Sequence, residues 1–101
     1  MEKSDFKEGT RYTLTEKNEQ GQLRPANVYV YKRFDDFMIV RNTNGDGRIR
    51  KLPYDRVEKI VREREVPVED RFYLPHQLLE ESVWQDRTFI NSYSSSPHMG
   101  K

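Results

Sequence analysis

The side chains that could perform catalysis are few and scattered along this sequence. Cysteine is absent, which excludes disulfides, thiolate metal sites and a cysteine nucleophile. The two histidines, His76 and His98, have neither the spacing of metal ligands nor a serine or carboxylate placed to form a catalytic triad. The glycines lie between predicted strands, with no helix start after them to receive a phosphate. The sequence therefore predicts a protein that is not an enzyme and uses no metal or cofactor.

The most specific motif match is the glycine-rich segment 42–49, which reads Asn-Thr-Asn-Gly-Asp-Gly-Arg-Ile. It follows the start of a calcium-binding EF-hand loop, which needs oxygen ligands at alternate positions and glycine at position six. A complete loop ends in a bidentate glutamate at position twelve, where this sequence has Pro53. The residues before the segment also favour a strand, where an EF-hand needs a helix. A glycine-rich turn between two strands is the better interpretation.

Basic and aromatic side chains gather in the middle of the chain. Residues 22–51 carry a net charge of +4, whereas the whole chain carries +1. A strand face that combines such side chains could stack bases and contact phosphates of RNA or single-stranded DNA. Alternatively, the aromatics fill the core and the arginines face water, which the nearly neutral overall charge favours. The residues concerned are Tyr29, Tyr31, Arg41, Arg48, Arg50, Lys51 and Tyr54.

Five short predicted strands must position these side chains. Residues 10–15 alternate between apolar and polar, and four later runs are rich in strand formers and separated by turn residues. Because Pro25 cannot donate a ladder hydrogen bond, we expect pairing of the second strand to begin after it. The expected strands are 10–15, 27–34, 37–41, 48–52 and 57–62, with a single turn of 3₁₀ helix at 53–56.

Closure into a barrel is the expected arrangement of these strands, because it encloses one core and removes most sheet edges. The short turn between the fourth and fifth strands resembles that of SH3-like and Sm-like barrels. This resemblance covers about residues 9–64 and concerns the fold alone. Only 34% of the chain is hydrophobic while 35% is charged, so we expect loose ends around a small core. Residues 1–8 are predicted to be a flexible lead and residues 91–101 a disordered tail.

Residues 65–90 are predicted to form an extended segment followed by a short helix over 75–87. Pro75 suits a first helical turn, and an apolar stripe of Leu78, Leu79, Val83 and Trp84 follows it. The stripe must be buried, either as a cap on one mouth of the barrel or against a partner or a second copy. The sequence does not decide between these two arrangements.

The sequence as a whole predicts a small, mainly all-β interaction module without catalytic activity. We expect a protein partner at Tyr29, Tyr31, Tyr54 and the Trp84 helix, with Arg48 and Arg50 pairing with its carboxylates. The alternative is RNA or single-stranded DNA on Arg41, Arg48, Arg50 and Lys51 with the same aromatics. A third alternative is a structural subunit that assembles only with itself, as a homo-oligomer. No apolar run reaches membrane-spanning length, so we expect a cytoplasmic protein that does not bind membranes.

Overall fold

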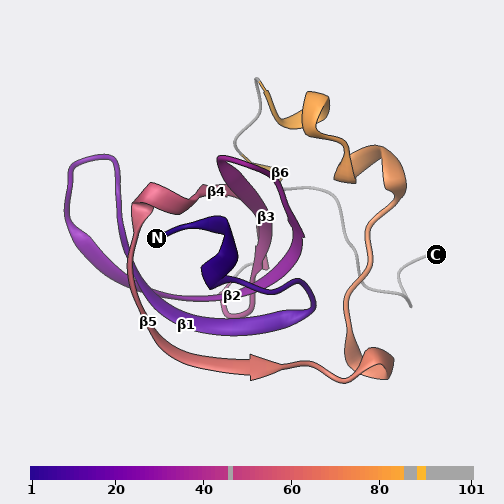
Figure 1. Ribbon diagram of the computed structural model, residues 1–101, viewed down its shortest axis with the longest axis horizontal. Helices are drawn as coiled ribbons and strands as arrows, with labels where there is room; N and C mark the ends of the chain where they lie inside the picture. The colour runs from indigo at the N-terminus through magenta and orange to yellow at the C-terminus, as the bar shows by residue number, and fades with distance from the viewer. Residues whose placement is uncertain (46, 86–88, 91–101) are drawn as a thin grey trace.

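Antiparallel strands dominate the computed structural model, which describes residues 1–45, 47–85 and 89–90 (Figure 1). They form one sheet in the order β5-β1-β2-β3-β4-β6. The predicted mainly-β class is therefore confirmed. Within the described residues this order is open, since β5 and β6 at its two ends are not paired. The strands are β1 (Thr10–Lys17), β2 (Leu23–Arg33), β3 (Phe37–Asn42), β4 (Ile49–Pro53), β5 (Val57–Glu65) and β6 (Phe89–Ile90).

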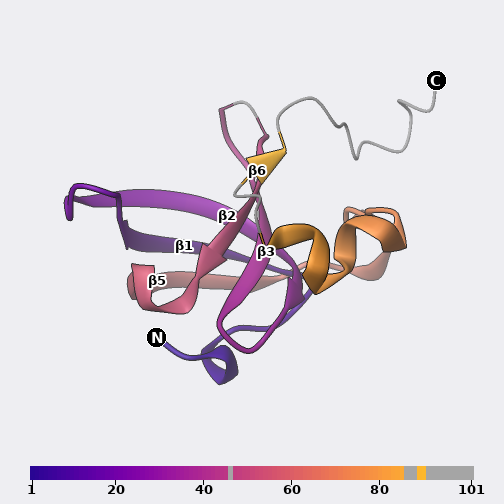
Figure 2. The ribbon, with the colours of Figure 1, turned by 90° about the horizontal axis from the view of Figure 1, so that it is seen from above.

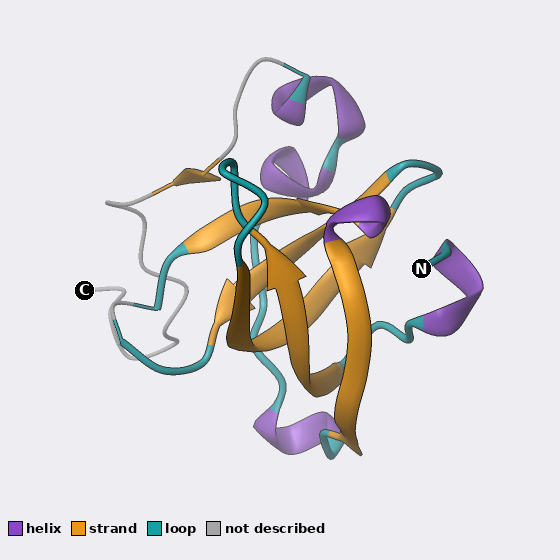
Figure 3. Cartoon of the chain, turned by 90° about the vertical axis from the view of Figure 1, so that its left-hand side faces the viewer, coloured by secondary structure: helices purple, strands orange, loops and turns teal. Residues whose placement is uncertain are grey.

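The long strand β2 bends the sheet. Its first half pairs with β1 and its second half with β3, and the register shifts between Val30 and Lys32. Such a bulge kinks a strand and increases its twist. Leu23 and Arg24 also belong to β2, so the pairing of this strand begins before Pro25 and not after it, as we expected. Pro25 lies opposite Thr15 at a point where β3 has not yet joined, so its missing N–H faces an unpaired edge. Figure 3 shows how strongly the strands curve.

One core lies inside the curve of the sheet. The N-terminal turn η1 (Lys3–Asp5) brings Phe6 into this core, where its ring lies 5.1 Å from that of Tyr12 and 5.9 Å from that of Tyr54. The segment 1–8, predicted as a flexible lead, supplies a fully buried side chain, Phe6. This inner core consists of Phe6, Tyr12, Leu14, Val28, Val30, Met38, Val40, Leu52, Tyr54 and Val57.

A second core covers the outer face of β3 and β4. Since alternate residues of a strand point to opposite faces, Met38 and Val40 reach the inner core while Phe37 and Ile39 reach this one. The outer core is completed by Ile49 and Trp84. Burial on both faces explains why β3 reads as a continuous apolar run.

The chain after β5 supplies the outer cover as a series of 3₁₀ turns, η3 (Val68–Asp70), η4 (His76–Leu79) and η5 (Glu81–Trp84). The helix predicted over 75–87 is therefore replaced by two turns up to Trp84, and residues 86–88 lie outside the described part. The two turns are separated by Glu80, whose backbone is extended. This break lets the Trp84 indole N–H donate to the carbonyl of Leu78 at 2.8 Å and the ring enter the core. Figure 2 shows these turns against the β3 side of the sheet.

The glycine-rich segment forms the turn of the β3–β4 hairpin, as predicted. Gly45 and Gly47 have φ values of 68° and 67°, in the left-handed region that glycine adopts without strain. Asp46 lies outside the described residues. The predicted 3₁₀ turn is also present, as η2 (Tyr54–Arg56) between β4 and β5.

Candidate binding surfaces

Most of the aromatic side chains predicted as contact residues are buried. Tyr29 is 3% exposed and Tyr54 4%, so the expectation that these two aromatics are exposed is wrong. Trp84 is 0% exposed and packs on the sheet of its own chain, which was one of the two arrangements that the sequence left open. Tyr31 is half-buried, with its ring edge-to-face at 5.2 Å from that of Tyr29. The physical reason is the small number of aliphatic residues, which leaves aromatics to supply the buried area.

The side chain of Arg50 also binds groups of its own chain. Its guanidinium donates to both carboxylate oxygens of Glu16, at 2.5 and 3.0 Å, and its Nε donates to Asn42 Oδ1 at 3.0 Å. We expected Arg50 to pair with a carboxylate of a partner, and here Glu16 of the same chain takes that place. Arg48, predicted to act with it, is half-buried in the loop before β4.

The remaining predicted cations lie under the C-terminal segment. Lys51 donates from Nζ to the carbonyl of Trp84 at 2.8 Å and sits 4.6 Å from the centroid of the Phe37 ring. Arg41 lies over the ring of Phe72 at 4.6 Å, and the same ring packs against Tyr29 at 5.3 Å. The structure thus brings Tyr29, Tyr31 and Arg41 together, but it covers this face of β2–β4 with the chain's own residues.

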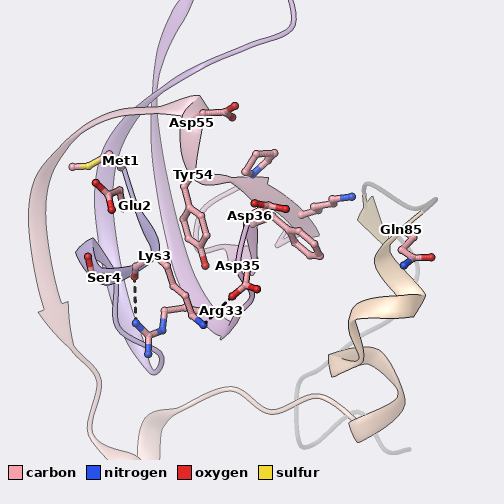
Figure 4. A pocket seen from close by; sticks show the side chains of 13 residues that line it. Met1, Glu2, Lys3, Ser4, Arg33, Asp35, Asp36, Tyr54, Asp55 and Gln85 are labelled. Atoms are coloured by element: carbon pink, nitrogen blue, oxygen red, sulfur yellow. Dashed lines mark hydrogen bonds and ion pairs between the residues drawn. The ribbon is translucent and has the colours of Figure 1, made fainter.

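A pocket of considerable size lies beside the N-terminal turn, and we call it the N-terminal pocket (Figure 4). It has a volume of about 920 Å³. Its walls come from η1, from the β2–β3 turn, from the end of β4 with η2, and from Gln85. The lining residues are Met1, Glu2, Lys3, Ser4, Arg33, Asp35, Asp36, Phe37, Lys51, Pro53, Tyr54, Asp55 and Gln85.

The cations of the N-terminal pocket are held by neighbouring groups. Arg33 donates from Nη1 to the carbonyls of Lys3 and Phe6, at 3.2 and 2.9 Å, and Lys3 Nζ lies 3.6 Å from Asp35 Oδ1. Asp36 and Asp55 are exposed, and their carboxylates form no ion pair within the described part of the chain. Asp36 and Asp55 are therefore available to pair with a cationic group of a ligand.

Tyr54 on the wall of this pocket is a structural group. Its hydroxyl donates to the carbonyl of Phe34 at 2.5 Å. Burial raises the pKa of Tyr54 to about 12, an effect that the nearby Arg33 opposes only in part. A phenol with so high a pKa stays protonated at neutral pH and cannot act there as a general base.

A smaller pocket of about 200 Å³ lies on the outer face of β1 and β5, and we call it the arginine pocket. None of its arginines was predicted as a site residue. The alternation of Arg62 and Arg64 could have indicated a shared face, but only the strand register places Arg11 beside them. Its lining residues are Arg11, Tyr12, Thr13, Asn27, Thr43, Arg62 and Arg64.

In the part of the chain that the structure describes, no three His, Cys, Asp or Glu side chains gather as metal ligands would. The same residues include no helix with the length and apolar character needed to cross a bilayer. Comparison with protein-family models, with curated proteins and with solved structures found no match for this chain. What it binds must therefore be inferred from its own surfaces.

Proposed function

We propose that this chain is a non-catalytic binding module that holds a segment of a partner protein in the N-terminal pocket. The proposal rests on one observation: two exposed carboxylates without ion pairs among the described residues lie beside apolar side chains on the wall of this pocket. Asp36 and Asp55 offer unpaired carboxylates beside Phe37, Pro53 and Tyr54. An extended segment with an arginine or lysine would pair its cation with these carboxylates and lay its apolar atoms on the wall.

We further propose that the curved sheet is a small barrel of the SH3-like or Sm-like kind. Three features support this proposal: the strand order β5-β1-β2-β3-β4, the single 3₁₀ turn η2 between β4 and β5, and the ion pair of Glu16 and Arg50. That pair connects β1 with β4, which are not neighbours in the sheet. A barrel built in this way would fix the β2–β3 turn and η2 as rigid walls for the ligand.

Binding at this pocket should be weak and transient. Phe37 and Tyr54 are largely buried, so the wall offers little apolar area, and small interfaces are typical of transient complexes. RNA or single-stranded DNA on the β2–β4 face stays a prediction with less support, because Arg50 and Lys51 are engaged in internal contacts.

Titration of the ¹⁵N-labelled full chain with short peptides tests the proposal. Peptides that carry arginine or lysine in an extended proline-containing frame should shift the amide signals of Asp35, Asp36 and Asp55. The same peptides with glutamate in the basic position should not. Loss of both carboxylates in Asp36→Asn/Asp55→Asn should weaken binding by about a hundredfold or more, because each charged hydrogen bond contributes about 1.5 kcal/mol or more and about 1.4 kcal/mol is a factor of ten.

Asp70→Asn is the matched control, since Asp70 is exposed on η3 and does not line the pocket. It should bind the basic peptides as the unchanged protein does. Equal shifts with acidic and basic peptides, or shifts that Asp70→Asn reduces as strongly as the double variant, would contradict the proposal.

A further inference from the structure

The arginine pocket brings three guanidinium groups to one small hollow, and we propose that it binds a phosphate group. Arg11 on β1 and Arg62 and Arg64 on β5 line it, and all three are exposed. This inference does not depend on the N-terminal pocket, with which the arginine pocket shares no lining residue.

The strand register forces these cations together. Arg11 pairs directly with Arg64, and Thr13 pairs with Arg62, so the three arginines stand in two adjacent rows of the same face. Directly opposed residues have their Cβ atoms about 5 Å apart, and like charges at that distance destabilise a sheet. An anion bound between the guanidinium groups would remove this repulsion.

The acids of β5 do not neutralise the arginines. Glu63 and Glu65 alternate with them and so point to the other face, where Glu63 lies 3.6 Å from Lys7 Nζ and Glu65 lies 3.6 Å from Arg71 Nη2. Among the residues that the structure describes, Arg11, Arg62 and Arg64 have no ion pair or hydrogen bond from their side chains. Their positive charge is available to a ligand.

Neutral groups on the pocket wall add suitable hydrogen-bond donors. Thr13 Oγ1 donates to Asn27 Oδ1 at 2.7 Å, which leaves both N–H bonds of the Asn27 side-chain amide free to donate. Thr43 contributes to the same wall. The pocket therefore presents donors from β1, β2, β5 and the loop after β3, and no carboxylate lines it.

The donor set suits phosphate better than carboxylate. A single arginine can satisfy both oxygens of a carboxylate, whereas three planar forks match the larger number of oxygens on a phosphate. The aromatic residue on the wall, Tyr12, is buried, so the pocket offers no surface on which a base could stack. The phosphate could come from a small phosphorylated compound or from an oligonucleotide backbone.

Titrations of the full chain with inorganic phosphate and with pyrophosphate test the proposal, with chloride at matched ionic strength as the reference. Both phosphates should shift the Nε–H signals of Arg11, Arg62 and Arg64 in nuclear magnetic resonance spectra. Arg62→Gln should weaken pyrophosphate binding about tenfold, and Arg62→Lys should weaken it less, because lysine keeps the charge but loses the fork. Arg24→Gln is the matched control, since Arg24 is exposed on β2 and lies outside this pocket.

Competition with a short oligothymidylate identifies the source of the phosphate. If the oligonucleotide displaces pyrophosphate and its affinity falls steeply with salt, the ligand is a nucleic-acid backbone. If pyrophosphate stays bound, the ligand is a small phosphorylated compound. Signals that respond to phosphate no more than to chloride, or an equal loss of affinity in Arg24→Gln and Arg62→Gln, would overturn the proposal. Failure of peptide binding at the N-terminal pocket would leave it intact.

Discussion

Arg50 on β4 and Glu16 on β1 form a bidentate ion pair whose side chains are only 18% and 15% exposed. The third guanidinium nitrogen of Arg50, Nε, donates its N–H to Asn42 Oδ1. Limited exposure reduces screening by water and salt, and the hydrogen bonds offset the cost of partly desolvating the charges. Because β1 and β4 are not adjacent in the sheet, the pair connects two strands that no ladder hydrogen bond joins. We therefore expect this ion pair to stabilise the curved arrangement of the sheet.

We expect Glu16→Gln to lower the free energy of unfolding by about 1–3 kcal/mol, since Arg50 would keep its charge and lose a charged acceptor. Urea denaturation followed by circular dichroism measures this loss. The adjacent residue provides the control: Lys17 Nζ lies 3.9 Å from Glu58, and both side chains are 49% exposed. Lys17→Gln should cost less than about 1 kcal/mol, as exposed pairs do. Equal losses of unfolding free energy in the two variants would show that the Glu16–Arg50 pair contributes no more to stability than an exposed pair.

At the scale of elements, the segment after β5 acts as part of the core. Trp84 is fully buried against Phe37, Ile39 and Ile49. We expect Trp84→Ala to lower the free energy of unfolding by about 3–5 kcal/mol, the range for truncating a large buried aromatic. Val68→Ala is the control, because Val68 is 64% exposed on η3 and should contribute little.

The same residue reports directly on docking of the segment, because it is the only tryptophan in the chain. In the native protein its fluorescence should be protected from acrylamide, and in urea it should be quenched fully. Quenching of the native protein to the same extent as the unfolded protein would contradict the placement of Trp84 in the outer core.

The strands could be predicted from sequence because their signals are local. Alternation in β1 and the glycines before β4 depend only on neighbouring residues, and both features appear in the structure. The contacts between distant segments could not be predicted in this way. That Arg11 lies opposite Arg64, and that Trp84 reaches β3, depends on strand register and on a chain path set by the whole core.

At the scale of the whole molecule, a net charge near zero conceals, in the described part of the chain, one pocket with unpaired carboxylates and another with unpaired guanidinium groups. The chain has a net charge of +1, yet the N-terminal pocket offers unpaired carboxylates and the arginine pocket offers three unpaired guanidinium groups within the described residues. The net charge of the whole chain therefore reveals neither pocket. Because they share no lining residue, substitutions in one pocket should leave ligand binding at the other unchanged.

Burial of tyrosines in β1, β2 and η2 makes stability sensitive to alkaline pH. Desolvation is the main cause that raises the pKa of Tyr12, of Tyr29 and of Tyr54, the last to about 12, from an ordinary value of 10.0. Between these values the unfolded chain releases phenolic protons that the folded protein keeps. The unfolded state then binds fewer protons, so the free energy of unfolding must fall as pH rises from about 10 to about 12.

We expect Tyr54→Phe to reduce this alkaline loss, because phenylalanine has no proton to release in either state. The variant also loses the hydrogen bond to Phe34, so its stability at neutral pH should be lower, and the quantity to compare is the slope with pH. Tyr73→Phe is the control, since Tyr73 is 61% exposed and its surroundings change little on unfolding. All other ionisable groups are common to the three proteins and so cancel in the comparison. Urea denaturation at a series of pH values should therefore give a shallower slope for Tyr54→Phe alone. Identical slopes in the three proteins would mean that the alkaline loss does not arise from Tyr54.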